Sequence, residues 1–530
     1  MKQALQPLRF AIILTIGILI GIWYSPNKRW GGNKVSQIVQ LIKSNYVDTI
    51  DTETIEKEAV NTLLHSLDPH SSYLTATEAK EANEPLEGSF EGIGIEFLLR
   101  NDTIIIVDII DDGPSYNAGL QVGDRITQVD HKVLNGMGLK NQDVIKLLKG
   151  ESGSTLNLVI FRYSGNKVLN YSITRGSVSI KSVDAYFMAD KETGYIKISR
   201  FAANTFEEYQ TAYRALKNKG MQNLIIDLRD NGGGYLNTAQ KLADEFLDAN
   251  KKILTTRGEH TGNENFLATS KGDFEKGKLI VLVNENSASA SEILCGALQD
   301  NDRALIIGRR TFGKGLVQNS FTLKDGSALR LTISRYYTPS GRCIQRPYNH
   351  GYSEYEDDNK ERYHNGELFF KDSIKVNLKQ VFTTLGGRKV YGGGGVVPDV
   401  FVPLDTSNSS TLLTELLHKS VIRQLAYSYV EKYKTELNKY DSFLIFSETF
   451  EVDNTLWQEL EGNATSLQII WTVADFKRSK KEIERHLKAS IAKLLYKSNG
   501  YFYVENSQDE TFLKAITCMG SEKYFEKLTH

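Results

Sequence analysis

The segment KLIVLVNENSASASEILCGALQD, residues 278–300, combines a strand with a helix and thereby decides the fold. Its opening KLIVLV is almost entirely apolar, which is typical of a strand covered on both faces. A second apolar run, ALIIG at 304–308, follows the predicted helix. Strand, helix and strand in this order predict a mostly parallel, layered sheet.

The same alternation extends upstream of this segment. GYIKISRF (194–201) and NLIIDLRD (223–230) have the composition of strands. A further helix is expected near 236–248, and we predict an α/β unit over 177–405. Between the two strands, apolar side chains recur at the spacing of one helix face, namely Phe206, Tyr209, Tyr213 and Leu216.

A different pattern, typical of antiparallel strands, precedes that unit. GIGIEFLL (92–99) and TIIIVDII (103–110) are rich in β-formers and are separated by the turn pair Asn101-Asp102. DVIKLLKG (143–150) predicts a short helix, and TLNLVIFRY (155–163) predicts another strand. Together these elements predict a small β-barrel over 86–176.

Both ends of the chain are expected to be helical, over 29–85 and 406–530. Lys2 and Arg9 precede the apolar stretch FAIILTIGILIGIWY, and no small-residue cleavage site follows it. We therefore predict an uncleaved signal-anchor over 1–28. This would make the chain a single-pass protein of the inner (cytoplasmic) membrane, with its α/β unit over 177–405 in the periplasm or elsewhere outside the cytoplasm. A cleaved signal peptide and a buried core helix are the alternatives.

Composition argues against several classes of partner. Lys and Arg number 64 and Asp and Glu 65, a formal net charge of −1, whereas nucleic-acid binding needs a basic surface. The three cysteines, Cys295, Cys343 and Cys518, are too far apart for a zinc site or a disulfide framework, and we expect buried thiols. No metal-binding or nucleotide-binding motif occurs, so we expect no metal and no cofactor.

The predicted helix of the opening segment begins in a cluster of serines, Ser287, Ser289 and Ser291. A serine at a strand-to-helix junction can act as a nucleophile, because a helix N-terminus stabilises negative charge. Ser289 followed by Glu292 is also a capping box, in which the serine only caps the helix. Taken alone, these residues favour the cap.

Two other segments strengthen the case for catalysis. Taken alone, the first fits a surface lysine in a glycine turn better, and the second fits a common glycine-rich βα turn that can also hold phosphate. In TFGKGLVQ (311–318), Lys314 lies between two glycines in an otherwise apolar stretch, and Gln318 follows four residues later. A lysine deprotonates a serine only when it is neutral, which desolvation promotes, and a glutamine can orient the amine without restoring its charge. In DLRDNGGGYL (227–236), backbone N–H groups of the glycines could form an oxyanion hole.

Eight segments together resemble, in order, the carboxyl-terminal processing peptidases, also called tail-specific proteases. One such motif is weak evidence, but eight in register are specific, and they cover about residues 35 to 405. The segments are DPHSSYLT (68–75), FEGIGIEF (90–97), NAGLQVGDRI (117–126), LIIDLRDNGGG (224–234), SASASEI (287–293), TFGKGLVQ (311–318), YYTPSGR (336–342) and VVPDV (396–400).

The resemblance implies a multi-domain α/β protein with a layered, ClpP/crotonase-like catalytic core. It implies acyl-enzyme chemistry without a metal or cofactor, with Ser289 as nucleophile, Lys314 as general base and Gln318 orienting the lysine. The oxyanion hole would be formed by backbone N–H groups from the serine turn and the glycine turn, namely Ala290 and Gly233 or Gly234.

The unit at 86–176 resembles a PDZ domain inserted ahead of the catalytic core. Gly92, Ile93, Gly94 and Ile95 match the loop whose N–H groups bind a substrate's terminal carboxylate, after which the peptide joins the sheet edge as a strand. The resemblance therefore implies an endopeptidase whose partners are proteins with exposed apolar C-termini.

Two other functions compete with this one. A membrane-anchored PDZ scaffold would bind C-terminal peptides without cleaving them, but it has no need for Ser289 or Lys314. A histidine-dependent protease is the second, but no G-x-S-x-G or GDSGG segment accompanies the nine histidines. The C-terminal helices carry no motif, and dimerisation and docking of an adaptor or activator protein are the two roles considered for them.

Overall fold

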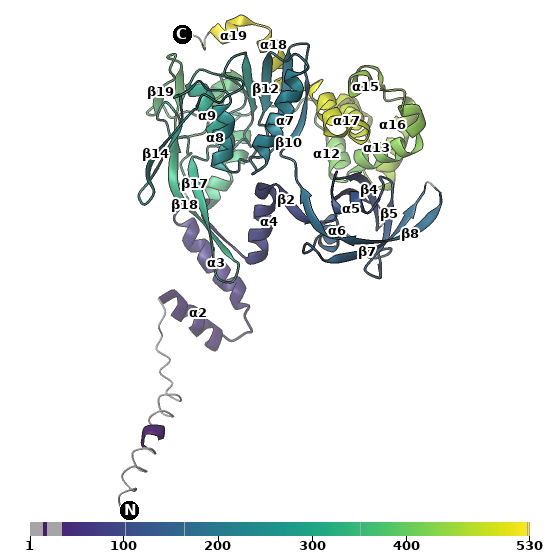
Figure 1. Cartoon of the computed structure of the whole chain (residues 1–530), viewed down its shortest axis with the longest axis horizontal. Coiled ribbons are helices and arrows are strands. Elements are labelled where there is room, and N and C mark those ends of the chain that lie inside the picture. Colours follow the sequence, from purple (N-terminus) through teal and green to yellow (C-terminus); the bar gives the residue numbers. More distant parts are fainter. Residues whose placement is uncertain are drawn as a thin grey trace, which may run out of the picture. The chain divides into compact units, whose positions relative to one another are not determined.

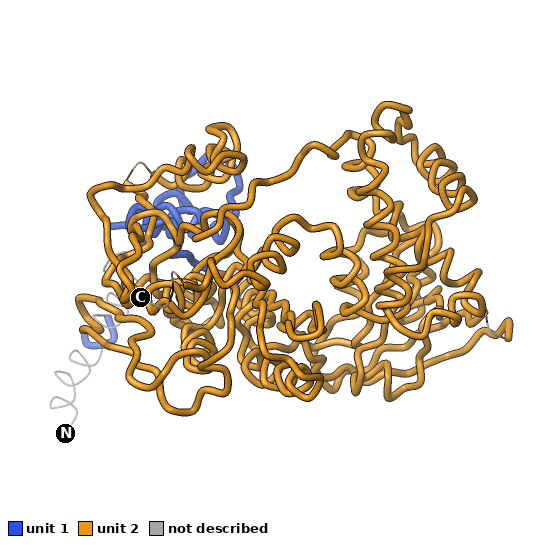
Figure 2. Tube along the Cα trace, turned by 90° about the horizontal axis from the view of Figure 1, so that it is seen from above, with its two compact units in different colours: residues 1–73 blue, residues 74–530 orange. Residues whose placement is uncertain are grey.

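The computed structural model describes residues 14–17, 34–100, 102–163, 165–349, 351–526 and 528. The chain divides into two compact units, residues 1–73 and 74–530, which Figure 2 colours separately. The smaller unit contains helices α2 (Lys34–Asn45) and α3 (Thr52–His65). Asp51 caps α3, since its Oδ1 accepts the N–H of Glu53 at 3.1 Å. Both helices lie within the predicted helical region 29–85.

A six-stranded sheet forms the centre of the larger unit, in the order β10, β11, β12, β15, β16, β21. All neighbouring pairs are parallel except β10 with β11. The mostly parallel α/β sheet predicted from the sequence is therefore confirmed. The strands, in sheet order, are Val183–Met188, Thr193–Ile198, Asn223–Asp227, Leu279–Val283, Leu305–Gly308 and Val400–Phe401.

Helices cover both faces of this sheet, because its strands are apolar on both sides. Ile226 belongs to the core beneath three helices that lie close together in Figure 1. Its neighbour Ile225 points the other way, into a core shared with α18 (Glu510–Met519). The three helices of the first face are α7 (Thr205–Lys217), α8 (Leu236–Asp244) and α9 (Ala290–Asp300).

An antiparallel sheet holds the loop that contains Lys314. In it, β17 (Leu316–Thr322) pairs with β18 (Ala328–Tyr337), β18 with β13 (Lys252–Gly258), and β13 with β14 (Gly262–Leu267). Residues 309–315, here named the lysine loop, connect β16 to β17. Shorter elements are β1 (Ser72–Leu74), α4 (Ala76–Glu87), α10 (Tyr352–Glu356), α11 (Asp358–His364), the 3-10 turn η1 (Lys371–Ser373), β19 (Val381–Thr383) and β20 (Lys389–Tyr391).

The region predicted as a barrel is a sheet with its own apolar core, built around side chains such as Ile104 and Leu158. The strand order is β3, β4, β5, β7, β8, with β6 paired to β5. The described pairings leave β3 and β8 at the two edges. Its elements are β3 (Ile95–Arg100), β4 (Thr103–Ile109), α5 (Pro114–Asn117), β5 (Arg125–Val129), β6 (Lys132–Val133), α6 (Asn141–Leu148), β7 (Thr155–Arg162) and β8 (Lys167–Thr174), and the ladder of β2 (Ser89–Gly92) with β9 (Gly176–Ser179) flanks it.

The C-terminal helices divide between two environments. Helices α12 to α17 pack around a core of their own, whereas α18 covers the second face of the large sheet. Within the predicted helical region 406–530, α12 and α13 are separated at Ser420, whose φ is 56°. These helices are α12 (Thr411–His418), α13 (Val421–Lys432), α14 (Lys434–Leu437), α15 (Phe443–Thr449), α16 (Asn454–Ser466), α17 (Val473–Asn506) and α19 (Glu522–Glu526).

The predicted single-pass anchor in the inner membrane is contradicted. In the described part of the chain, every helix is too short or too polar to cross a bilayer, which takes about 20 apolar residues. The longest of them, α17, spans 34 residues, but it is interrupted by a kink at Tyr496 and Lys497 and carries many charged side chains. Of the predicted segment 1–28, only residues 14–17 lie among the described residues.

Candidate active site

Ser289 lies where the chain turns from β15 into α9. Its φ of 55° is unusual for a residue with a side chain. Ser287 Oγ donates to the carbonyl of Leu228 at 2.8 Å, which ties the turn to the neighbouring strand. Ser291 Oγ donates to the carbonyl of Asn231 at 2.8 Å. Both outer serines are fully buried, whereas the middle one is half-buried.

The carboxylate of Glu292 joins the serine turn to the lysine loop. Its Oε2 accepts the backbone N–H of Ser289 at 2.9 Å and that of Lys314 at 2.8 Å. Its Oε1 accepts the N–H of Gly313 at 2.7 Å and the hydroxyl of Thr311 at 2.5 Å. Burial raises the pKa of Glu292, and the four hydrogen bonds oppose that rise. One buried side chain therefore links the backbones of the two main catalytic candidates.

Lys314 and Gln318 are brought together as the sequence predicts. Lys314 Nζ donates to Gln318 Oε1 at 2.8 Å. The pairing of β17 with β18 shifts register between Val317 and Gln318, and a bulge of this kind can re-aim a side chain. Tyr336 supports the loop from β18, with its hydroxyl 2.8 Å from Lys314 O and 3.2 Å from Ser289 O. Burial raises the pKa of Tyr336 well above its ordinary value, so it keeps its proton.

The glycine turn after β12 lies directly against the serine turn. A Cβ added to Gly233 would lie 2.9 Å from Ser289 Cβ and 3.0 Å from Ala290 N, and φ there is 102°, so only glycine fits. The Gly233 N–H donates to Asn231 Oδ1 at 2.9 Å. Among the described hydrogen bonds, none engages the N–H of Gly234 or Ala290. The two predicted glycines thus differ. The N–H group of Gly233 is hydrogen-bonded within the turn, whereas that of Gly234 makes none of the described hydrogen bonds.

A largely buried ionic network surrounds Asp227 and Arg229, the residues just before the glycine turn. Arg229 lies 2.6 Å from Asp227 through Nη2 and 2.7 Å from Asp509 through Nη1. Tyr195 donates to Asp227 at 2.8 Å, and Lys197 Nζ lies 3.3 Å from the same carboxylate. Burial acts to raise the pKa of Asp227, but Arg229 and Lys197 outweigh it and hold that pKa well below its usual range. Asp509 precedes α18, so the C-terminal region contributes to this support.

The predicted carboxylate-binding loop joins β2 to β3. Gly92 ends β2 opposite Gly176, and Gly94 has a φ of 76°. Ile93 is buried in the core of the small sheet, and Ile95 begins β3. In the described pairings β3 contacts only β4, so its outer edge can accept another strand.

Comparison with known proteins identifies the family. Residues 192–350 match peptidase family S41, residues 92–174 a PDZ domain, and residues 412–497 a family of unknown function, DUF8443. A carboxy-terminal-processing protease of Bartonella bacilliformis is 37% identical over 317 residues, which are 59% of this chain and 72% of that protein. The chain belongs to peptidase family S41, the carboxy-terminal-processing proteases.

Other relatives of this S41 peptidase carry similar names. A probable CtpA-like serine protease of Staphylococcus aureus is 34% identical over 317 residues, 59% of this chain and 62% of that protein. The solved photosystem II D1 C-terminal processing protease is 26% identical, with a TM-score of 0.34 over 69% of this chain and 86% of the other. The S41 and PDZ matches, together with the Bartonella relative, make this chain a serine-type peptidase with a PDZ domain.

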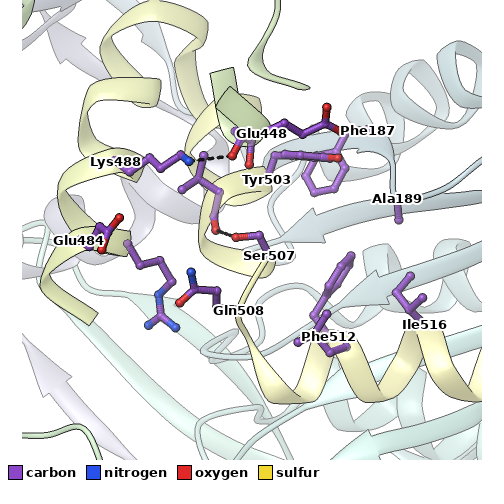
Figure 3. Close-up of a pocket in the computed structure, with 14 residues that line it drawn as sticks. Phe187, Ala189, Glu448, Glu484, Lys488, Tyr503, Ser507, Gln508, Phe512 and Ile516 are labelled. Atoms are coloured by element: carbon purple, nitrogen blue, oxygen red, sulfur yellow. Dashed lines mark hydrogen bonds between the residues drawn. The ribbon is translucent and has the colours of Figure 1, made fainter. Parts of the chain in front are cut away.

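The cavity in Figure 3 is separate from the catalytic candidates of the S41 peptidase. It lies where α15, α17 and α18 meet β10, and its lining includes Phe187, Tyr503 and Phe512 but not Ser289 or Lys314. Lys488 at its rim donates to the carbonyl of Ser447 at 2.7 Å, and burial lowers the pKa of that lysine. Lys488 therefore caps the C-terminal end of α15 by donating to carbonyl groups there.

Three residues that hold the S41 site together were not predicted to do so. Glu292 was identified only as part of a capping box, although it also binds the lysine loop. Tyr336 stands in the YYTPSGR motif and Asn231 in the NGGG motif, but neither motif shows which backbone groups they bind. The sequence indicated these residues only by their position within a motif. Most of their contacts join segments far apart in the sequence, which a local pattern does not contain.

Proposed function

We propose that Ser289 is the nucleophile of this S41 peptidase, Lys314 its general base and Gln318 the group that orients the lysine. The observation that carries the proposal is the Glu292 carboxylate, whose Oε2 lies 2.9 Å from the N of Ser289 and 2.8 Å from the N of Lys314. A buried acceptor shared by these two segments holds their backbones at a fixed spacing.

The proposed reaction has two steps. Neutral Lys314 takes the proton from Ser289 Oγ, and the oxygen attacks the carbonyl carbon of the scissile peptide bond. The lysine ammonium then gives its proton to the leaving amine, so that the C–N bond breaks and an ester to Ser289 remains. Water, deprotonated by Lys314, hydrolyses the ester and restores the serine. No metal or cofactor takes part.

Backbone N–H groups of Ala290 and Gly234 are the proposed oxyanion hole. Both stand next to the serine turn, and the donor of Gly233 is already engaged with Asn231. We assign Gly233 the role of shaping the turn, because a side chain there would meet Ser289. Pre-aligned donors of this kind stabilise the tetrahedral intermediate without reorganisation.

The PDZ domain is proposed to bind the C-terminus of the substrate. N–H groups in the loop from Gly92 to Ile95 would hold the terminal carboxylate, while the peptide pairs with the open edge of β3. Exposed apolar C-termini are the expected substrates. The predicted homodimer and the adaptor or activator protein belong to the same proposal, and light scattering and pull-down from a native extract test them.

Cleavage of a protein with an apolar C-terminal tail tests the catalytic assignment. We expect Ser289→Ala and Lys314→Ala to abolish cleavage while circular dichroism stays unchanged. Lys324→Ala, at an exposed position in the β17–β18 turn, is the matched control and should retain wild-type rates. Cleavage by Ser289→Ala at the wild-type rate would disprove the assignment.

Substrates with amidated C-termini test the role of the PDZ domain separately. Amidation removes the carboxylate charge but leaves the scissile bond in place, so we expect KM to rise at least tenfold. An unchanged KM for the amidated substrate would exclude carboxylate recognition without affecting the catalytic assignment.

A further inference from the structure

The segment of residues 351–367, which contains α10 and α11, packs on the lysine loop. It begins just beyond residue 350, where the match to peptidase family S41 ends. Its Arg362 has only 1% of its surface exposed. A buried guanidinium has five donors that need partners, and backbone groups of the lysine loop supply several of them.

Arg362 donates to three successive carbonyl groups of that loop. Its Nη1 lies 2.9 Å from Thr311 O and 3.3 Å from Arg310 O, and its Nη2 lies 3.0 Å from Phe312 O. Residues 310–315 form neither helix nor strand. The carbonyl groups of residues 310–312 therefore lie outside any sheet ladder, and the planar guanidinium binds them instead. Lys314 follows two residues after the last of these carbonyls.

A second arginine, Arg346, contacts the lysine loop through the ring of Phe312. The guanidinium of Arg346 lies between two rings, 4.0 Å from the centroid of Phe312 and 3.8 Å from that of Tyr355. Asp358 joins both arginines: it contacts Arg346 Nη1, and its Oδ2 lies 2.7 Å from Arg362 Nε. The guanidinium of Arg362 is thus itself held in one orientation.

A third arginine belongs to the loop and is anchored in the same segment. Arg310 makes a two-pronged contact with Glu367, at 2.6 and 2.8 Å. Burial lowers the pKa of Arg362 to about 10, and the charge of Arg310 adds to that effect. Arg362 therefore stays charged at neutral pH, where its hydrogen bonds are needed.

We propose that Arg362 is a positioning residue for the peptidase reaction, because it fixes the loop backbone that carries Lys314. This inference rests on the proposed role of Lys314 as the base. A misplacement of about 1 Å can cost about 100-fold in rate, so the loop must be rigid although it has no regular structure. The segment outside the family match supplies that rigidity.

The test is Arg362→Met in the full chain, with cleavage of a tailed substrate followed across pH. We expect kcat to fall about 100-fold while KM stays nearly unchanged. The acidic limb of the pH profile should move to higher pH, because a displaced Lys314 regains water and a pKa nearer its ordinary value of about 10.4. Arg362→Lys keeps the positive charge but cannot donate to several carbonyl groups at once, as the planar guanidinium does. Its kcat and pH profile should lie between those of wild type and Arg362→Met.

Arg388→Met is the matched control. Arg388 is also largely buried and lies 2.6 Å from both Asp302 and Asp399, and its remaining described hydrogen bond goes to the carbonyl of Gln299. We expect this variant to lower Tm and to keep the wild-type kcat and pH profile.

The outcomes separate positioning from simple stability. A wild-type kcat and pH profile in Arg362→Met, together with a Tm lowered as in Arg388→Met, overturns the proposal. Where Arg362→Met does not fold, Arg362→Lys decides: a lower kcat with a shifted profile supports positioning, and wild-type values overturn it. Activity in Lys314→Ala would instead overturn the catalytic assignment.

Discussion

Charged side chains support two regions of this peptidase in opposite ways. Around the catalytic candidates they are buried: Glu292 accepts four hydrogen bonds in the protein interior, and Arg362 donates to three carbonyl groups. Between the PDZ strands and the C-terminal helices they are exposed. Lys493 and Glu96, 2.8 Å apart, have 41% and 45% of their side chains in solvent.

The difference shows which contacts can fix a geometry. Removing one partner of a buried charged contact leaves the other unsatisfied and costs about 3–5 kcal/mol, so the catalytic elements are held in one arrangement. An exposed ion pair is worth about 0.2–1 kcal/mol. Where the PDZ strands meet the C-terminal helices, a small buried apolar cluster of Leu98, Ile105 and Tyr427 stabilises the contact more than the exposed ion pairs do.

Glu292→Ala removes the buried charged group at the catalytic candidates and should lower stability and activity more than Glu245→Gln or Lys493→Ala. Four neutral donors lose their acceptor, and each unsatisfied buried donor costs about 1–3 kcal/mol, so we expect a loss of several kcal/mol in the free energy of unfolding and cleavage to become undetectable. Urea denaturation and tailed-substrate cleavage measure the two effects. Glu292→Gln keeps one acceptor oxygen and should be milder in both, and equal stability of Glu292→Ala and wild type would contradict the role given to this carboxylate.

Glu245→Gln sharpens the comparison with a buried carboxylate that has no ion pair among the described contacts. Burial raises the pKa of Glu245 to about 7. Because the folded state then binds the proton more tightly than the unfolded state, stability should fall as pH rises from about 4.5 to about 7 and level off above. The variant should lack this part of the slope and be about 1–3 kcal/mol more stable than wild type at pH 8. Parallel slopes for both proteins in urea titrations would refute the expectation.

Lys493→Ala tests the exposed side and should have the smallest effect. Loss of the ion pair with Glu96 should lower the free energy of unfolding by less than about 1 kcal/mol. At about 1 M salt the difference should vanish, because the Debye length is then only about 3 Å. A loss that persists in high salt would show that this lysine acts through packing.

Local patterns were enough to predict four of the six strands of the large sheet, namely β11, β12, β15 and β16, but not β10 or β21. NLIID and LIVLV lie in β12 and β15 because continuous apolar runs can only be buried on both faces. Ser289, Lys314 and Gln318 could be predicted from motifs, and the structure brings the lysine and the glutamine into contact. Cys295 and Cys518 are buried as expected, while Cys343 is half-buried.

The remainder depends on contacts between distant segments, which a linear pattern does not contain. The donor of Gly233 is engaged because Asn231 folds back on it, and Glu292 meets the lysine loop only through the tertiary fold. Similarly, nothing in the composition of 510–519 distinguishes a helix on the large sheet from one in the separate helical core. The inner-membrane prediction was wrong because it rested on the terminal apolar stretch alone.

The position of α18 has a consequence for synthesis. A ribosome makes every strand of the large sheet before it makes residues 510–519, so the core around Ile225 and Ile280 lacks its α18 side chains until then, although α15 and α17 already contribute to it. A chain stopped short of α18 would contain every catalytic candidate and yet expose a sticky apolar surface, the typical starting point of aggregation. The core on this face of the catalytic sheet is therefore expected to be completed only after residues 510–519 have been translated.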